Sequence, residues 1–322
     1  MRLRSKTTRR DARGILFLAA IGLSFFGDID AASAFCRAKT CGNKCAADEN
    51  ECPIGAVPIA WPGSCLSYSV QEDGSPSISR AQVSFAADAA FRAWQEAQCP
   101  SRLARPTLTI GDVFGPARCG RVEYNPGQAN ANIIVIRESW EAGQSDALAL
   151  TTVTYGPTTG EIYDADIEIN GSEPISTEPM GVNFYDLQSI LTHEAGHFLG
   201  LAHSKEGVAD NCVGGPTMCA RYAPGVDDFR TLEADDVAGI CAVYPPERNV
   251  PACDPRPRMG FSPECGLDPV SGGGCSLAIA RVRPSSRGMT VMVLGFGLVV
   301  RRLRRVGQRA QKLTYGPKPI DR

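Results

Sequence analysis

Hydrophobic and polar residues in the middle of the chain repeat with the periods of short strands and amphipathic helices. Residues 65–70 alternate between apolar and polar side chains, which is typical of a strand. Four further runs also indicate strands: 108–113, 132–136, 149–155 and 162–169. A Gly-Pro-Thr-Thr-Gly turn over 156–160 separates the last two runs and predicts that they are neighbours along the chain.

Three segments show helical periodicity. Over 77–98, five apolar residues recur at steps of three and four and form one stripe: Val83, Ala87, Ala90, Phe91 and Trp94. Further helices are expected over 186–199 and 232–243, whereas 204–231 is rich in Gly, Pro and Asp and is predicted to be irregular. We therefore expect an α+β fold, with a mixed sheet, two main helices and a loop-rich lower half that the third helix closes.

Composition restricts the class of protein. The 322 residues are 43% hydrophobic and 21% charged, which is typical of a globular protein with one or two cores. The formal net charge is −2. Because no excess of Lys and Arg is available to neutralise phosphates, nucleic acid is not expected as a partner.

The basic residues are concentrated at the two ends, and the N-terminal group resembles an export signal. Six Arg and Lys residues between positions 2 and 13 precede an apolar run of 13 residues from Gly14 to Phe26. Small residues at 32–34 follow, as at a signal-peptidase site. We interpret residues 1–34 as a signal peptide; an N-terminal membrane anchor is the alternative, for which the run is short.

Thirteen cysteines support export to an oxidising compartment. We expect the first twelve, from Cys36 to Cys265, to form disulfides and Cys275 to be left over. The spacing leaves the connectivity open.

All three histidines of the chain lie in one short segment, His193-Glu194-Ala195-Gly196-His197-Phe198-Leu199-Gly200-Leu201-Ala202-His203. Residues four apart share a helix face, so His193 and His197 are expected to bind one metal ion. Gly200 permits a positive φ that ends the helix and allows His203 to return as the third ligand.

Three neutral nitrogen ligands predict a catalytic zinc with one open coordination position. A water there becomes acidic enough to supply hydroxide near neutral pH. Glu194, next to the first ligand, is the expected general base, which would pass the proton to the leaving amine.

This segment resembles the signature of the metzincin metalloproteases, HExxHxxGxxH followed by a methionine turn. Ser204, directly after the third histidine, resembles the matrixin branch, and Met218 is the candidate methionine of the turn. The resemblance covers about 61–247. It implies a twisted mixed β-sheet with two main helices above the cleft and an irregular lower subdomain closed by a C-terminal helix.

Other segments resemble matrixins with less specificity. Residues 90–94 are similar to the first helix, 163–170 to the edge strand that holds substrate, and 232–240 to the closing helix. The resemblance also suggests that Tyr222 lines a substrate pocket. Cys212 and Cys219 bracket the presumed methionine turn, so we predict that they pair.

The chain departs from the animal matrixins in two ways. Arg118-Cys119-Gly120 matches only part of the cysteine-switch motif, and a disulfide is the expected role of Cys119. The three histidines are all used by the first site, so a second zinc is not expected. Calcium is a weaker hypothesis at three residues, which otherwise would simply be solvated: Asp164, Asp166 and Asp210.

The C-terminal region has a sorting pattern of its own. Cys275 follows three glycines, and a polar spacer leads to an apolar run over 288–300 and then to a basic cluster over 301–305. This resembles the myxobacterial sorting tail called MYXO-CTERM, which implies surface attachment with Cys275 as the processing residue. A plain membrane anchor is the alternative, for which 13 residues are short.

The predicted organisation therefore has five parts: signal peptide 1–34, Cys-rich extension 35–60, catalytic domain 61–247, linker 248–274 and tail 275–310. We expect a monomeric zinc endopeptidase, secreted or attached to the cell surface, that cleaves extracellular or extracellular-matrix proteins. The alternatives are a catalytically weak adhesion module on the same fold and a zinc hydrolase of a non-peptide substrate.

Overall fold

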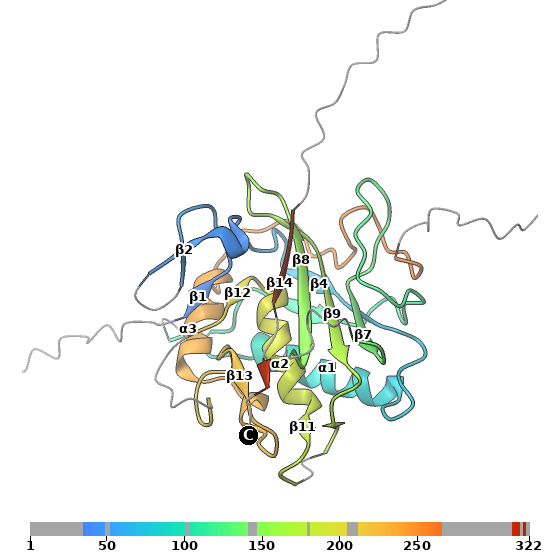
Figure 1. Cartoon of the computed structure of the whole chain (residues 1–322). Coiled ribbons are helices and arrows are strands. Elements are labelled where there is room, and N and C mark those ends of the chain that lie inside the picture. Colours follow the sequence, from blue (N-terminus) through green and yellow to red (C-terminus); the bar gives the residue numbers. More distant parts are fainter. Residues whose placement is uncertain are drawn as a thin grey trace, which may run out of the picture. The chain divides into compact units, whose positions relative to one another are not determined.

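The computed structural model describes residues 35–48, 52–100, 104–140, 147–178, 181–204, 212–265, 311–315 and 318–319 (Figure 1). The predicted signal peptide, Cys275 and the apolar run 288–300 lie outside these residues, as does Asp210. Within the described residues, no helix is long and apolar enough to cross a membrane.

A five-stranded sheet forms the centre of the fold, with strand order β14-β8-β9-β7-β5. Its strands are β5 (Ser69–Val70), β7 (Ile133–Arg137), β8 (Ala149–Tyr155), β9 (Ile162–Asn170) and β14 (Gln311–Tyr315). The pairs β5–β7 and β7–β9 are parallel, whereas β8 pairs antiparallel with β9 on one side and with β14 on the other. The sheet is therefore mixed, as the sequence predicted.

Short two-stranded pairs surround this sheet. They are β4 (Cys65–Ser67) with β6 (Thr109–Gly111), β1 (Cys36–Arg37) with β12 (Leu201–Ala202), β2 (Ala46–Ala47) with β3 (Pro53–Ile54), β10 (Ile175–Ser176) with β11 (Tyr185–Asp186), and β13 (Arg221–Tyr222) with β15 (Lys318–Pro319). One-turn 3₁₀ helices span Gly42–Lys44 and Asp228–Arg230. The β1–β12 pair joins the N-terminal extension to the segment that follows the second helix.

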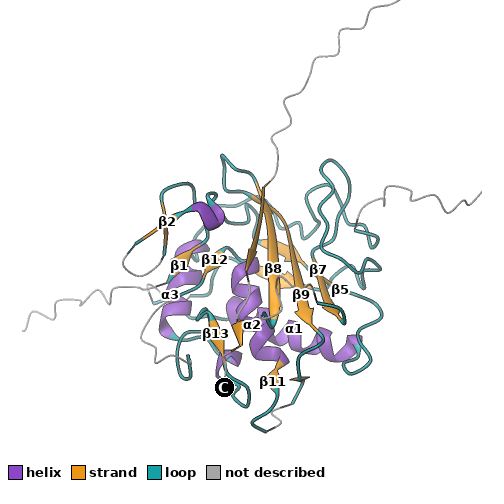
Figure 2. Cartoon of the chain, viewed as in Figure 1, coloured by secondary structure: helices purple, strands orange, loops and turns teal. Residues whose placement is uncertain are grey.

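The three predicted helices are present as α1 (Arg80–Gln95), α2 (Leu187–Phe198) and α3 (Ala234–Val243) (Figure 2). The start of α1 is set by a capping box, in which Ser79 accepts the backbone N–H of Gln82 and the Gln82 side chain accepts the N–H of Ser79. Asp186 caps α2 by accepting the N–H of Ser189 at 2.8 Å. These caps explain why α1 and α2 begin slightly later than the hydrophobic pattern suggested.

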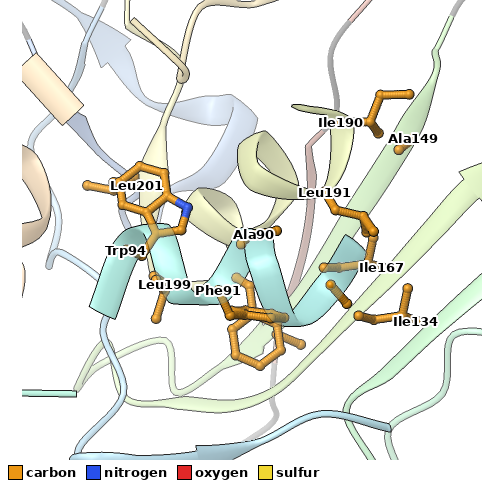
Figure 3. Packing of buried hydrophobic residues seen from close by; sticks show 14 of the residues in the cluster. Ala90, Phe91, Trp94, Ile134, Ala149, Ile167, Ile190, Leu191, Leu199 and Leu201 are labelled. Atoms are coloured by element: carbon orange, nitrogen blue, oxygen red, sulfur yellow. The ribbon is translucent and has the colours of Figure 1, made fainter. Parts of the chain in front are cut away.

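The core lies where α1 and α2 pack against each other and against the sheet. Figure 3 shows Phe91 and Trp94 of α1 and Leu191 of α2 in this cluster, together with Ile134 of β7 and Ile167 of β9. The predicted stripe of α1 is buried, since Val83, Ala87, Ala90, Phe91 and Trp94 are each at most 1% exposed. Burial of this stripe anchors α1 beneath the helix that carries the histidines.

The prediction that the strand at 163–170 is the edge strand is wrong. β9 pairs with β7 on one side and with β8 on the other, so it lies inside the sheet. Strand β8, which follows β7 in the chain, pairs with β9 on the side of β9 that faces away from β7. Hydrophobic periodicity reports which faces of a strand are buried but not its place in the strand order, which explains the error.

The expectation that Asp164 and Asp166 are simply solvated is also wrong, because both are buried in β9. Asp166 accepts the backbone N–H of Ile133 at 2.8 Å and that of Glu123 at 3.0 Å. Its carboxylate therefore satisfies backbone donors of two neighbouring segments. Calcium binding at these residues stays a prediction.

Six disulfides confirm that the first twelve cysteines pair. They are Cys36–Cys52, Cys41–Cys45, Cys65–Cys253, Cys99–Cys241, Cys119–Cys265 and Cys212–Cys219. The predicted Cys212–Cys219 bond and the disulfide role of Cys119 are both present. Three bonds link residues more than a hundred positions apart: Cys99–Cys241 ties α3 itself to the body of the fold, and Cys65–Cys253 and Cys119–Cys265 tie the segment after α3 to it.

Candidate metal centre

Helix α2 places two histidine rings beside each other. The Nε2 atoms of His193 and His197 are 3.1 Å apart, and both side chains are fully buried. The spacing of four residues along a helix produces this arrangement, as predicted from the sequence.

The chain then turns at Gly200, which has φ +91°. A Cβ atom at this position would lie 2.6 Å from the carbonyl oxygen of Ile59, so both the backbone angle and the packing require glycine. After the turn, β12 leads back and the Nε2 atom of His203 lies 3.2 Å from that of His197. The three histidines thus converge, with ligand atoms within 4.8 Å of one another.

The Nδ1 atoms of the two helical histidines face backbone carbonyls. His193 Nδ1 lies 2.6 Å from the carbonyl oxygen of Thr217, and His197 Nδ1 lies 3.0 Å from that of Leu201. An N–H at Nδ1 that donates to a carbonyl leaves the lone pair of Nε2 free for a metal.

Burial also keeps these rings neutral. It lowers the pKa of His193 to about 3, with a further contribution from His203, and lowers the pKa of His197 well below its usual range. Neutral imidazole is the form that binds a metal.

These residues fit zinc. A tetrahedral ion bound at about 2.0–2.1 Å holds its ligand nitrogens at about 3.3 Å from one another. The two short Nε2 distances, 3.1 and 3.2 Å, are close to that value. Among the described residues, these histidines form the group of His, Cys, Asp or Glu side chains that could hold a metal ion.

Glu194 is fully buried between α2 and β8. Its Oε2 atom accepts a hydrogen bond from the hydroxyl of Thr151, which also lies 3.2 Å from the Glu194 carbonyl oxygen. Its Oε1 atom has no hydrogen-bond partner among the described residues. Burial raises the pKa of Glu194 above its usual range, and the Thr151 hydroxyl opposes this shift.

Met218, the candidate methionine of the turn, packs against α2 at Gly196, between the two helical histidines. It is 3% exposed, and a Cβ atom added to Gly196 would lie 2.2 Å from its sulfur atom. Asp236 of α3 holds the turn, because its carboxylate accepts the N–H of Thr217 at 2.7 Å and of Met218 at 3.0 Å. The same Thr217 presents its carbonyl to His193.

Four residues of this site were not identified from the sequence: Thr151, Gly196, Asp236 and Trp94. The indole N–H of Trp94 donates to the carbonyl oxygen of Thr192 at 2.8 Å. Gly196 carried a signal, because a glycine inside a helix is costly unless close packing requires it. The other three act through contacts between distant segments, which no local pattern encodes.

Tyr222, predicted to line a substrate pocket, is 2% exposed. Its ring lies 5.0 Å from that of Phe229, whose ring in turn stacks 6.2 Å from His193. The side chain therefore supports the wall beside the histidines from the interior, and its contact with substrate stays a prediction.

Comparisons with known proteins agree with this geometry. Residues 125–245 match the matrixin family model. The chain is 27% identical over 190 residues to human matrix metalloproteinase-20, covering 58% of this chain and 33% of that protein. It is 35% identical over 86 residues to metalloendoproteinase 1-MMP of Arabidopsis thaliana, covering 27% of this chain and 19% of that protein.

The chain thus spans about a third of the length of the human relative and about a fifth of the length of the Arabidopsis relative. The matched region nevertheless contains β7, β8, β9, α2 and α3, and with them all three histidines, Glu194 and Met218. The family match, the two relatives and the three-histidine cluster together support a matrixin-like metalloprotease.

Proposed function

We propose that this protein is an exported zinc endopeptidase in which His193, His197 and His203 hold one catalytic zinc and Glu194 is the general base. The observation that supports this most strongly is the convergence of three buried or partly buried histidine nitrogens next to a buried carboxylate. The resulting fold assignment is metzincin-like, with Gly200 and Met218 as structural supports. Zinc, when bound, would polarise the scissile carbonyl and make water acidic.

Glu194 has the properties of a base that transfers a proton. Oε2 is held by Thr151, which fixes the orientation of the carboxylate and leaves Oε1 for water. A carboxylate held in this way, with one oxygen free, can take a proton from a water molecule at that oxygen. The protonated carboxyl group can then donate that proton from Oε1 to the nitrogen of the leaving amine.

Export and surface attachment belong to the same proposal. The interpretation of residues 1–34 as a signal peptide agrees with six disulfides, which form in oxidising compartments. We further propose that the linker 248–274 leads to a sorting tail, 275–310, processed or modified at Cys275. The substrate would be an extracellular protein, cleaved by a monomer.

The test is digestion of casein, gelatin and a peptide library by the full chain, read by mass spectrometry with zinc quantified in the same preparation. Glu194→Ala should retain zinc and lose cleavage by about a thousandfold, whereas Glu96→Ala, an exposed carboxylate, should change neither. Full activity of Glu194→Ala would refute the mechanism. Zinc binding without peptide cleavage, both in the unaltered chain and in a variant whose strand β14 is disrupted, would favour the adhesion module or a non-peptide hydrolase.

A further inference from the structure

The outer edge of β8 is covered by a segment from the far end of the chain. Strand β14 pairs antiparallel with β8 in continuous register, from Gln311 opposite Tyr155 to Tyr315 opposite Thr151. Figure 1 shows β14 alongside β8 on the side away from β9. Without β14, β8 would be an open sheet edge with unpaired backbone N–H and C=O groups.

Further along the chain, strand β15 pairs with a second element, β13. Strand β15 begins three residues after the end of β14 and runs parallel to β13, with Lys318 opposite Arg221 and Pro319 opposite Tyr222. β13 begins three residues after Met218, the residue that packs under the histidine-bearing helix. Strands β14 and β15 therefore pair with two elements, β8 and β13, that lie far apart in the sequence.

Both contacts are next to the metal centre. Thr151, opposite Tyr315, is the residue whose hydroxyl holds Glu194. Tyr222, opposite Pro319, packs on Phe229 and through it on His193. Tyr315 and Lys318 are three residues apart, and three residues span at most about 11 Å. Strand β14 thus pairs beside the proposed base, and β15 pairs beside the residues that pack on the histidines.

Backbone pairing of this kind blocks an extended peptide. A strand that adds to a sheet edge uses the edge's own N–H and C=O groups, largely independently of side chains. A second extended peptide cannot pair with the outer edge of β8 while β14 occupies it. Because β14 belongs to the same chain, it competes with a free peptide for the edge of β8 at a high effective concentration.

We propose that strands β14 and β15 form an intramolecular inhibitor, in which β14 occupies the edge of β8, β15 pairs with β13, and extended peptide substrates are excluded. This inference rests on the proposed peptidase function. It gives the C-terminal tail a role in latency: removal of the tail at or near Cys275 would also remove the inhibitor. A chain whose residues 288–300 crossed a membrane would carry 311–319 to the opposite side, which would likewise free β8.

The experiment compares two double-proline variants of the full chain. Leu313→Pro with Thr314→Pro disrupts β14, because adjacent residues of a strand direct their N–H groups to opposite sides and proline has none. Gln308→Pro with Arg309→Pro is the matched control, placed before the strand. We expect the first variant to raise kcat/KM for a peptide substrate about tenfold, as losing one or two backbone hydrogen bonds would, and the control to leave it unchanged.

A second measurement does not depend on activity. In the Glu194→Ala background, hydrogen–deuterium exchange of the β8 amides should be slow in the full chain and faster in the Leu313→Pro/Thr314→Pro variant, with α2 amides unaltered as a test of folding. Unchanged β8 exchange, or unchanged kcat/KM in an active enzyme, would overturn the inhibitor. Faster β8 exchange in a chain that cleaves no peptide would support the docking of 311–319 and refute the peptidase function instead.

Discussion

Thr151 of the sheet and Glu194 of α2 are joined by a buried hydrogen bond, although 43 residues separate them. The hydroxyl is a single donor that faces both the carboxylate and the backbone carbonyl of the same glutamate. This contact fixes the side chain of the proposed base relative to the sheet, and it places one carboxylate oxygen at a defined position.

Thr151→Val keeps the shape of the side chain and removes the hydroxyl. We expect kcat to fall about tenfold or more with zinc content unchanged, because Glu194 loses the group that orients it. Thr151→Ser should recover most of the loss. Steady-state kinetics and metal analysis provide the measurement.

Thr154→Val is the matched control for this variant. Thr154 lies on the same strand, is 1% exposed, and its hydroxyl has no hydrogen-bond partner among the described residues. Its replacement should leave kcat unaltered. A Thr151→Val enzyme as active as the Thr154→Val enzyme would show that the contact does not contribute to catalysis.

Gly196→Ala should destabilise the protein by about 1–3 kcal/mol, because the added methyl group would overlap the sulfur atom of Met218 and the ring of Trp94. Gly120→Ala is the comparison, since a Cβ there meets no atom within 4 Å. Urea unfolding of both variants measures the difference. Equal stabilities would mean that Met218 moves aside at little cost.

Asp236 predicts a specific pH dependence of stability. Burial raises its pKa from 3.8 to about 6 in the folded protein, against the effect of the three backbone N–H groups that it accepts. A carboxyl with a raised folded pKa stabilises most below the unfolded pKa, and this contribution is lost as the pH rises through about 6.

The measurement compares the zinc-free full chain with Asp236→Asn by urea unfolding between pH 4 and pH 7. The stability advantage of the unaltered protein over the variant should shrink by about 2–3 kcal/mol across this range. The subtraction cancels the titration of the histidines. An advantage that grew with pH would contradict the raised pKa.

Zinc should stabilise the folded protein as well as make it active, because the three proposed ligands come from α2 and from the segment beyond its end. At zinc about a hundredfold above Kd, the expected gain in unfolding free energy is about 2.7 kcal/mol. A chelator should therefore lower Tm and abolish peptide cleavage, and added zinc should restore both.

His203→Ala is the variant that checks this linkage. His203 is the least buried of the three histidines, so its truncation should disturb packing least. The zinc-dependent shift in Tm should largely disappear, since one of three protein ligands is lost. Calorimetry with and without zinc distinguishes the outcomes, and a full shift in this variant would exclude His203 as a ligand.

The sequence by itself determined the parts of this protein that depend on near neighbours. His193 and His197 share a helix face because helical geometry repeats every few residues, and Gly200 returns His203 because glycine alone adopts φ +91° there without strain. Strands β4 to β9, the three helices and the pairing of twelve cysteines were predictable for similar reasons, from periodicity and redox chemistry.

Only the tertiary structure decided which segments distant in the sequence are in contact. The position of β9 inside the sheet, the Thr151–Glu194 hydrogen bond, the hold of Asp236 on the methionine turn and the pairing of 311–315 with β8 all join segments distant in sequence. Periodicity identifies a buried face but not its partner, since many strand orders bury the same faces equally well. The three histidines were therefore readable in the sequence, whereas the residues that contact them and the strand that pairs with β8 were not.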